Sequence, residues 1–209
     1  MRRTFITLPD FSSLSPFSNS VPEAQTYHER KILPYVRSEL YRVVADVSSY
    51  HKFIPFCTSS RILESSSPLQ AHLTARDKPD VLEMDGELTV AFLALKESYV
   101  SKVTCKPYES VQAVALSSTP LFKNLTTTWR FQPASPQSPH MSMDGPTAQT
   151  QKISAGDEAG PTLLTLDLSY AFANPLHAAV SSAFFGQVSK LMVEAFEKRC
   201  LAVYGLGRK

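Results

Sequence analysis

The sequence predicts an α+β domain in which a curved antiparallel sheet wraps around one long C-terminal helix. Between residues 82 and 172, several segments alternate apolar and polar side chains with a period of two. Antiparallel strands show this alternation when one face is buried and the other is wet. After residue 174 the apolar residues recur at helical spacing, down to about residue 203. With 43% hydrophobic and 19% charged residues among 209, the chain can bury a core, which excludes a wholly disordered protein.

The segments before this sheet predict one strand and two helices. The strand covers 27–33 and ends at a proline. A helix follows over 38–46, with Ser38 as its N-cap and apolar residues at helical spacing. A second, short helix covers 48–53. The stretch over 65–80 is rich in serine and proline and predicts a loop.

Five further strands make up the rest of the predicted sheet. In the strand predicted over 82–92, Leu88 and Val90 alternate with acidic and threonine residues. In the strand predicted over 164–172, Leu166 and Leu168 alternate with polar residues. The third of these strands has the weakest alternation. Their predicted ranges are 82–92, 99–105, 108–116, 125–131 and 164–172.

An insertion and the terminal helix complete the chain. Residues 133–161 contain prolines, serines and glycines without apolar periodicity, which predicts a long disordered insertion. The helix is predicted to begin with Asn174 as its cap and Pro175 at its first position, and to end before Gly205. Its apolar residues face the concave side of the sheet, where the space between sheet and helix is either filled by side chains or left as a cavity.

Charge and motifs exclude several classes of protein. The chain has 21 Lys and Arg against 19 Asp and Glu, so a nucleic acid is a poor partner. No stretch approaches 18 consecutive apolar residues, which excludes a transmembrane helix. The three cysteines are far apart and not clustered with histidines, so we expect no metal site and no disulfide framework. Phosphate-binding, zinc-protease and nucleophile-elbow motifs are missing as well.

The first 25 residues have the composition of a targeting sequence. They are basic, rich in serine and poor in acidic residues, as mitochondrial transit peptides are. An ordinary disordered tail is the alternative.

Few polar side chains offer catalytic chemistry. Glu83, Asp85 and Glu87 share one face of a predicted strand, but it is the polar face, so we expect them to be solvated rather than to form an acid/base site. Asp167 has the same position on its own strand and the same interpretation. His51, on the short second helix, is expected to be exposed.

Two interpretations stay open for several larger side chains. Tyr99 and Tyr170 point inward, and either hydrogen-bond a polar ligand head group or lie in the core with satisfied hydroxyls. Trp129 and Phe131 either fill the core or line a cavity. The pair Leu121-Phe122 follows a proline and either forms a membrane-touching tip or folds inward.

Taken in order, these segments resemble the coenzyme Q-binding protein family of mitochondria, a branch of the START-like (polyketide cyclase) superfamily. The resemblance covers about residues 26–201 and includes Tyr50. Its matching stretches are YHERKILPY at 27–35, VVADV at 43–47, FIPFC at 53–57, LTVAF at 88–92, FKNL at 122–125, WRF at 129–131 and MVEAFEKR at 192–199.

The resemblance implies a helix-grip fold of about seven strands with a hydrophobic tunnel, formed by a START-like domain over 26–203. It implies a protein without catalytic residues, metal or cofactor. Its ligand would be coenzyme Q (ubiquinone) or a polyprenyl quinone precursor, carried for respiration and for efficient coenzyme Q biosynthesis. It would be a peripheral protein on the matrix side of the mitochondrial inner membrane, with coenzyme Q biosynthetic enzymes as further partners.

Combining the strand parity with this resemblance gives a set of candidate site residues. We expect Phe53, Pro55 and Phe56 at the tunnel mouth, and Leu121 and Phe122 in contact with the membrane. The tunnel itself is expected to be lined by Met84, Leu88, Val90, Tyr99, Trp129, Phe131, Leu166, Leu168, Tyr170, Phe184, Val188 and Met192.

Two other functions remain as alternatives. START-like relatives include cyclases and aromatases, and an enzyme of that type would need a buried acid or base in the cavity. Only tyrosines are available there, and an unperturbed tyrosine titrates near 10. Bacterial relatives include a ribosome-associated protein, but the near-neutral charge argues against direct contact with RNA.

Overall fold

A computed structural model describes residues 24–63, 81–92, 95–116, 122–135, 160–173 and 175–207, with the backbone alone for residues 92, 95 and 175–188. The predicted transit peptide, the loop over 65–80 and most of the insertion over 133–161 lie outside the described residues, as do Leu121 and the predicted cap Asn174. None of the helices in the described part has the length and apolar character that crossing a bilayer requires.

Within the described ranges, seven strands form one antiparallel sheet in the order β1-β7-β6-β5-β4-β3-β2. Three helical elements accompany it: α1 (Arg37–Ala45), the short 3-10 helix η1 (Val47–Lys52) and the long α3 (Pro175–Tyr204). The strands are β1 (Gln25–Leu33), β2 (Cys57–Ile62), β3 (Leu82–Phe92), β4 (Leu95–Lys106), β5 (Ser110–Ala115), β6 (Phe122–Pro133) and β7 (Thr162–Phe172).

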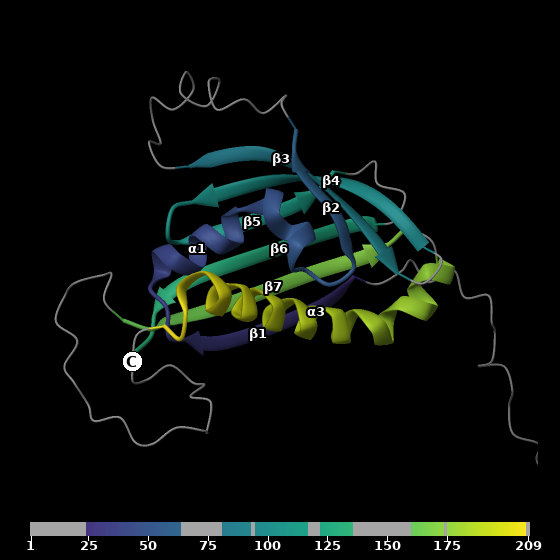
Figure 1. Cartoon of the computed structure of the whole chain (residues 1–209). Coiled ribbons are helices and arrows are strands. Elements are labelled where there is room, and N and C mark those ends of the chain that lie inside the picture. Colours follow the sequence, from purple (N-terminus) through teal and green to yellow (C-terminus); the bar gives the residue numbers. More distant parts are fainter. Residues whose placement is uncertain are drawn as a thin grey trace, which may run out of the picture.

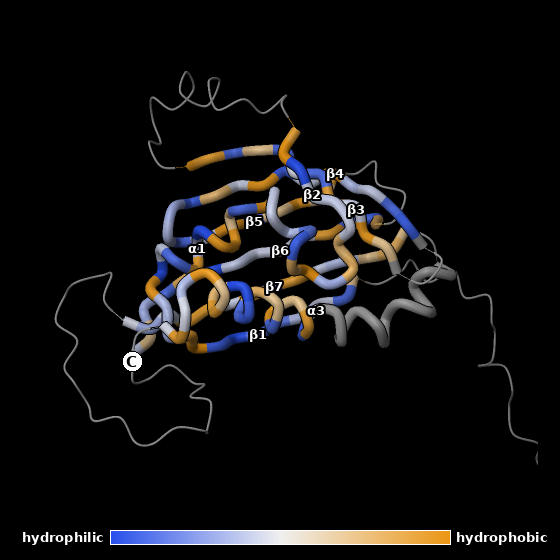
Figure 2. Tube along the Cα trace, in the orientation of Figure 1, coloured by the Kyte–Doolittle hydropathy of each residue, from blue (hydrophilic) through white to orange (hydrophobic). Residues whose placement is uncertain are grey.

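The curved sheet has α1 and α3 on the same face, with α3 lying along it (Figure 1). Strands alternate hydrophobic and hydrophilic positions along their length (Figure 2), so one face is apolar. The main core lies between this face, α1 and the C-terminal half of α3, and a second cluster around Phe122 and Phe172 lies at the other end of β6 and β7. The predicted architecture is confirmed.

Two local predictions need correction. Strand β2 was not expected, because its residues Cys57–Ile62 are mostly small and polar and show no apolar alternation. Ser38 is not a cap, since α1 already begins at Arg37 after Val36. Val36 donates its backbone N–H to the Glu39 carboxylate over 3.2 Å, as the glutamate of a capping box does, and the Glu39 N–H bonds to the Val36 carbonyl.

The end of α3 is fixed against the segment that follows β1. Gly205 ends the helix with φ 77° and donates its N–H to the Leu201 carbonyl over 2.9 Å, a left-handed termination that favours glycine. The Tyr35 hydroxyl donates to the Gly205 carbonyl over 2.8 Å. The two ends of the domain are thereby held together.

The convex face of the sheet carries the acidic residues, as predicted. Glu83 lies 2.9 Å from Lys102 Nζ, and Glu87 lies 2.5 Å from Arg61 Nε. Asp167 on β7 contacts His28 Nδ1 on β1, at 2.6 Å, and the guanidinium of Arg130 on β6. These pairs join neighbouring strands on the solvent side and leave the concave side apolar.

Candidate functional site

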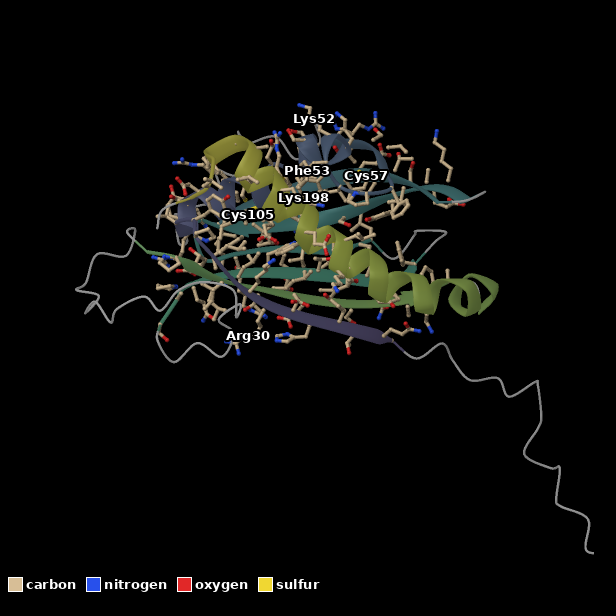
Figure 3. All side chains as sticks on the ribbon, turned by 60° about the horizontal axis from the view of Figure 1, so that its bottom comes forward. Arg30, Lys52, Phe53, Cys57, Cys105 and Lys198 are labelled. Carbon is tan, nitrogen blue, oxygen red and sulfur yellow. The ribbon has the colours of Figure 1, made fainter. Side chains whose placement is uncertain are left out.

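A cavity of about 180 Å³ lies between the concave face of the sheet and α3. Strands β2 to β7 contribute inward-facing residues to it, the segment from η1 to β2 covers one side, and Ser189, Met192 and Phe196 of α3 cover another. Figure 3 shows Phe53 and Cys57 near the β2 edge of the sheet and Arg30 on β1, at the other edge.

Small side chains at neighbouring inward positions keep this space open. Gly86 on β3 pairs with Ser101 on β4, and Ala113 on β5 pairs with Thr127 on β6. A Cβ atom at Gly86 would lie 3.1 Å from Val47 Cγ1, so glycine lets η1 pack closely onto the sheet. Larger side chains at Ser101, Ala113 and Thr127 would fill the gap beneath α3, since interiors are otherwise close-packed, whereas one at Gly86 would press against Val47.

About half of the predicted site residues line this cavity. Both Pro55 and Phe56 of the predicted mouth line it. Of the predicted tunnel residues, those that line it are Leu88, Val90, Tyr99, Trp129, Leu168 and Met192. The side chains of Phe184 and Val188 are outside the described part.

The other predicted residues pack elsewhere in the core. Phe131 lies under α1, with its ring edge-on to Tyr41 at 6.1 Å between centroids. Met84 and Leu166 belong to the main core. Phe53 contacts Phe196, with centroids 5.2 Å apart. These positions share the inward face with the lining residues but lie beyond the open space.

Tyr170 has its hydroxyl occupied, because it donates to Gln25 Oε1 over 2.7 Å. Its ring packs against Phe172 in the second apolar cluster. This arrangement agrees with the interpretation of Tyr170 as a core tyrosine with a satisfied hydroxyl.

Sequence reasoning missed several lining residues that share the inward parity. Ser101 and Val103 follow Tyr99 at intervals of two, and Thr127 precedes Trp129 by two, so alternation could have found them. Gly86 carried no hydrophobic signal. The other residues missed are Val47, Tyr50, Ile54, Cys57, Val111, Ala113, Leu125, Phe172, Ser189 and Phe196.

Phe56 lies at the boundary between cavity and solvent. It lines the cavity while 36% of its surface is exposed. Its φ of 64° is a left-handed conformation that is rare for a bulky residue. The backbone carbonyl of Phe56 is held by the Ala91 N–H at 2.8 Å, so the turn is fixed to β3.

Phe122 corrects one prediction. It is only 4% exposed, and its ring stacks on Phe172 and meets Tyr99 edge-on. As a buried member of the cavity wall, Phe122 cannot reach a membrane surface. It folds inward because β6 extends further toward its N-terminal end than alternation indicated.

The polar groups of the cavity wall are neutral. Among the described residues that line it, none is Asp, Glu, His, Lys or Arg. Burial raises the pKa of the Cys57 thiol to about 11 and also raises the pKa of Tyr99 and of Tyr50. The described residues bring together no group of His, Cys, Asp and Glu that could hold a metal ion. The site is built to hold an apolar molecule with few polar atoms.

Comparisons with known proteins agree with this description. The family model for polyketide cyclase/dehydrase and lipid transport matches residues 33–197. Coenzyme Q-binding protein COQ10 homolog B of Xenopus laevis is 32% identical over 181 residues, which cover 86% of this chain and 59% of that protein. Coenzyme Q-binding protein COQ10 of Dictyostelium discoideum is 32% identical over 175 residues, covering 84% of this chain and 68% of that protein. Both are named as mitochondrial.

Solved structures show the same fold. An aromatase/cyclase of Streptomyces has a TM-score of 0.58 at 13% identity, covering 88% of this chain and 99% of that one. An 18 kDa protein of Caulobacter crescentus has a TM-score of 0.57 at 25% identity, covering 87% and 99%. The chain therefore belongs to the polyketide cyclase and lipid transport family, in the branch of the mitochondrial coenzyme Q-binding proteins.

Proposed function

We propose that this protein binds coenzyme Q, or a late polyprenyl quinone precursor, in the cavity beneath α3 and carries it for respiration and quinone biosynthesis. The observation that carries the proposal is the uncharged, largely apolar wall of that cavity, in a chain 32% identical to proteins named coenzyme Q-binding. Since a relative's name states the ligand of that relative, the ligand of this chain needs its own test.

The energetics suit a carrier. A polyprenyl quinone is almost insoluble in water, so it leaves a bilayer only for a comparably apolar site. Burying apolar surface contributes about 25 cal/mol per Å², and the membrane offers the same contribution. A cavity that matches the bilayer without greatly exceeding it can both take up the ligand and release it.

We place the protein in the mitochondrion, as a peripheral protein at the matrix face of the inner membrane. The mitochondrial names of the relatives support the organelle, and the exposed Phe56 ring at the cavity mouth supports contact with a lipid surface. Coenzyme Q biosynthetic enzymes are the partners we propose. Flotation with vesicles of inner-membrane composition tests the surface contact.

The binding proposal predicts quinone in the purified protein. Mass spectrometry of an organic extract, after expression in a quinone-producing host, should show stoichiometric polyprenyl quinone. Val90→Lys should lose it, because an unpaired charge in an apolar wall is strongly unfavourable. Val114→Lys makes the same change at an exposed position and should retain the ligand. An empty extract from folded protein that also takes up no quinone from vesicles would contradict the proposal.

A second candidate function comes from relatives with a different name. Ribosome association toxin RatA of Pseudomonas aeruginosa is 29% identical over 174 residues, covering 83% of this chain and 94% of that protein. Cosedimentation with mitochondrial ribosomes at moderate salt tests this function. Quinone-loaded protein that stays out of the ribosomal fraction would exclude it.

An enzyme is the third possibility, because the fold includes a cyclase. The described cavity wall has no carboxylate, histidine or lysine to move a proton, and its tyrosines have pKa values raised by burial. We therefore propose a binding protein. Recovery of a bound precursor unchanged after prolonged incubation is the expected result, and a chemically altered precursor would overturn it.

A further inference from the structure

Resting on the proposed function, we propose that the quinone ring occupies the cavity beneath α3, with the Tyr99 hydroxyl donating a hydrogen bond to a ring carbonyl, and that the tail leaves past Phe56. Tyr99 is then the residue that selects the head group. The protein would discriminate between rings more strongly than between tail lengths.

The size of the cavity favours a ring over a folded tail. A cavity of roughly 150 Å³ accommodates a single benzene molecule, and this one measures about 180 Å³. One substituted ring fits such a space, whereas a tail of many isoprene units does not. The tail therefore continues outside this space, and Phe56 is a lining residue that reaches solvent.

The Tyr99 hydroxyl is available as a donor. Tyr99 lines the cavity opposite Leu88 of β3, and its ring meets Phe122 at 5.5 Å between centroids. Within the described part of the chain, its hydroxyl has no hydrogen-bond partner. Burial raises its pKa, so the hydroxyl keeps its proton throughout the physiological range. The hydroxyl oxygen is not among the fully buried atoms that lack a partner, so it keeps accessible surface, and a carbonyl oxygen of a ligand in the cavity can accept its hydrogen bond.

The hydroxyls of two other tyrosines, Tyr50 and Tyr170, already donate hydrogen bonds to protein groups. Tyr50 also lines the cavity, but its hydroxyl donates to the Val44 carbonyl. Tyr170 donates to Gln25 and lies outside the cavity wall. Ser101 and Thr127 also place hydroxyls in the wall. Because their side chains are short, these hydroxyls stay close to the sheet, whereas a tyrosine hydroxyl extends away from its own strand.

Aromatic rings around the open space suit a planar ligand. Trp129 and Phe196 meet at 4.7 Å between centroids, and Phe122 stacks on Phe172 at 5.3 Å. All four rings line the cavity. The faces of aromatic side chains are electron-rich, so a planar, electron-poor quinone ring gains from stacking on them beyond simple burial, and a saturated or isoprenoid segment does not.

The experiment uses a reporter that the chain already contains. Trp129 is its only tryptophan and lies in the cavity wall, so a bound quinone should quench its fluorescence. The full chain, freed of lipid, is titrated with 2,3-dimethoxy-5-methyl-1,4-benzoquinone, with the same ring bearing a decyl tail, and with a tail-only isoprenoid hydrocarbon as competitor. Wild type should bind both quinones and release them poorly to the competitor.

Tyr99→Phe should weaken binding of both quinones about 3- to 10-fold, the worth of one neutral hydrogen bond. The carbonyl stretching band of the bound ring, measured by infrared spectroscopy, should move up in frequency in this variant. Tyr170→Phe removes the same hydroxyl outside the cavity and should change neither readout. Circular dichroism verifies that both variants are folded.

The outcomes separate the two proposals. If wild type binds no quinone, the proposed function fails. If it binds quinone but Tyr99→Phe binds as tightly with an unchanged carbonyl band, only the assignment of the ring to Tyr99 fails. Strong displacement by the tail-only competitor would likewise overturn the placement of the ring, because the tail would then occupy the cavity.

Discussion

Small residues on four adjacent strands determine whether this fold has a cavity or a filled core. Ala113 lies at the centre of the sheet, with Val103 and Thr127 as its register partners. The adjacent Val114 points to the opposite, solvent face and is 41% exposed. The two positions therefore offer a matched test of whether the open space matters.

Ala113→Phe should fill the cavity and lower quinone affinity at least tenfold. Because the new ring enters existing space, its effect on the free energy of unfolding should stay within about 1–3 kcal/mol. Val114→Phe adds the same ring on the outer face and should leave affinity unchanged. Tryptophan quenching measures affinity, and urea denaturation measures stability. Undiminished binding by Ala113→Phe would mean that the ligand binds elsewhere.

At the scale of single residues, hydrophobic alternation predicts which residues face the cavity, but it does not predict that a cavity exists between them. Leu88, Val90 and Trp129 were predictable because apolar residues of one parity share a face. Phe131 obeys the same rule and yet packs under α1, because the sequence pattern does not say where a helix crosses the sheet. Gly86 was not predictable, since a residue without a side chain carries no hydrophobic signal.

The carboxylate of Asp167 links three strands, β1, β6 and β7, on the convex face of the sheet. Asp167 on β7 joins His28 on the edge strand β1 and Arg130 on β6. Burial disfavours its ionisation, but the hydrogen bonds from His28 and Arg130 prevail and lower the pKa of the carboxyl below its ordinary value of 3.8. The folded state is therefore favoured by ionisation of Asp167.

Asp167→Asn should lower stability at neutral pH and make little difference in acid. The stabilisation from a lowered pKa is present above pH 3.8 and is lost as the pH falls through the lowered value. With Asp167 40% exposed, solvent screening keeps the effect below about 1 kcal/mol. The melting temperatures of wild type and variant, followed from pH 7 to pH 3, should converge at the acid end. A constant difference across this range would contradict the ionic origin.

Helices and long strands were predictable at the element scale, whereas the short edge strand was not. The terminal helix was recognised from Pro175 to Gly205 because proline and glycine mark its two ends. Strand β2 is held mainly by pairing with β3 and by the Ser60 hydroxyl, which donates to the Ser48 carbonyl at 2.9 Å. Tertiary contacts of this kind leave no local pattern.

For the molecule as a whole, a ligand beneath α3 would become part of the core. Anything that binds only the folded state stabilises it, by about 2.7 kcal/mol at one hundred times the dissociation constant. In a domain of this size that corresponds to a rise in melting temperature of roughly 5–10 °C.

Decyl-tailed quinone should therefore raise the melting temperature of wild type and of Val114→Lys, and should leave Val90→Lys unaffected. Differential scanning fluorimetry with an external dye makes this measurement. Equal shifts in both lysine variants would indicate non-specific binding to the folded surface.

The overall architecture followed from the sequence because alternation, helix length and chain order all agreed. Both the alternating region after residue 82 and the long terminal helix can bury their apolar sides only against each other. The volume left between them depends on a few ångströms of helix placement, which no one-dimensional pattern encodes.

The three cysteines give the domain a set of internal reporters of local opening. All are buried and unpaired, and burial raises the pKa of Cys57 and Cys105 to about 11 and that of Cys200 to about 12. Because only the thiolate reacts readily, a thiol reagent modifies each one when its surroundings open transiently. Cys57 belongs to the cavity wall, Cys105 to the main core and Cys200 to the end of α3. Their separate modification rates would therefore distinguish local opening of the ligand site from local opening of the core and of the end of α3.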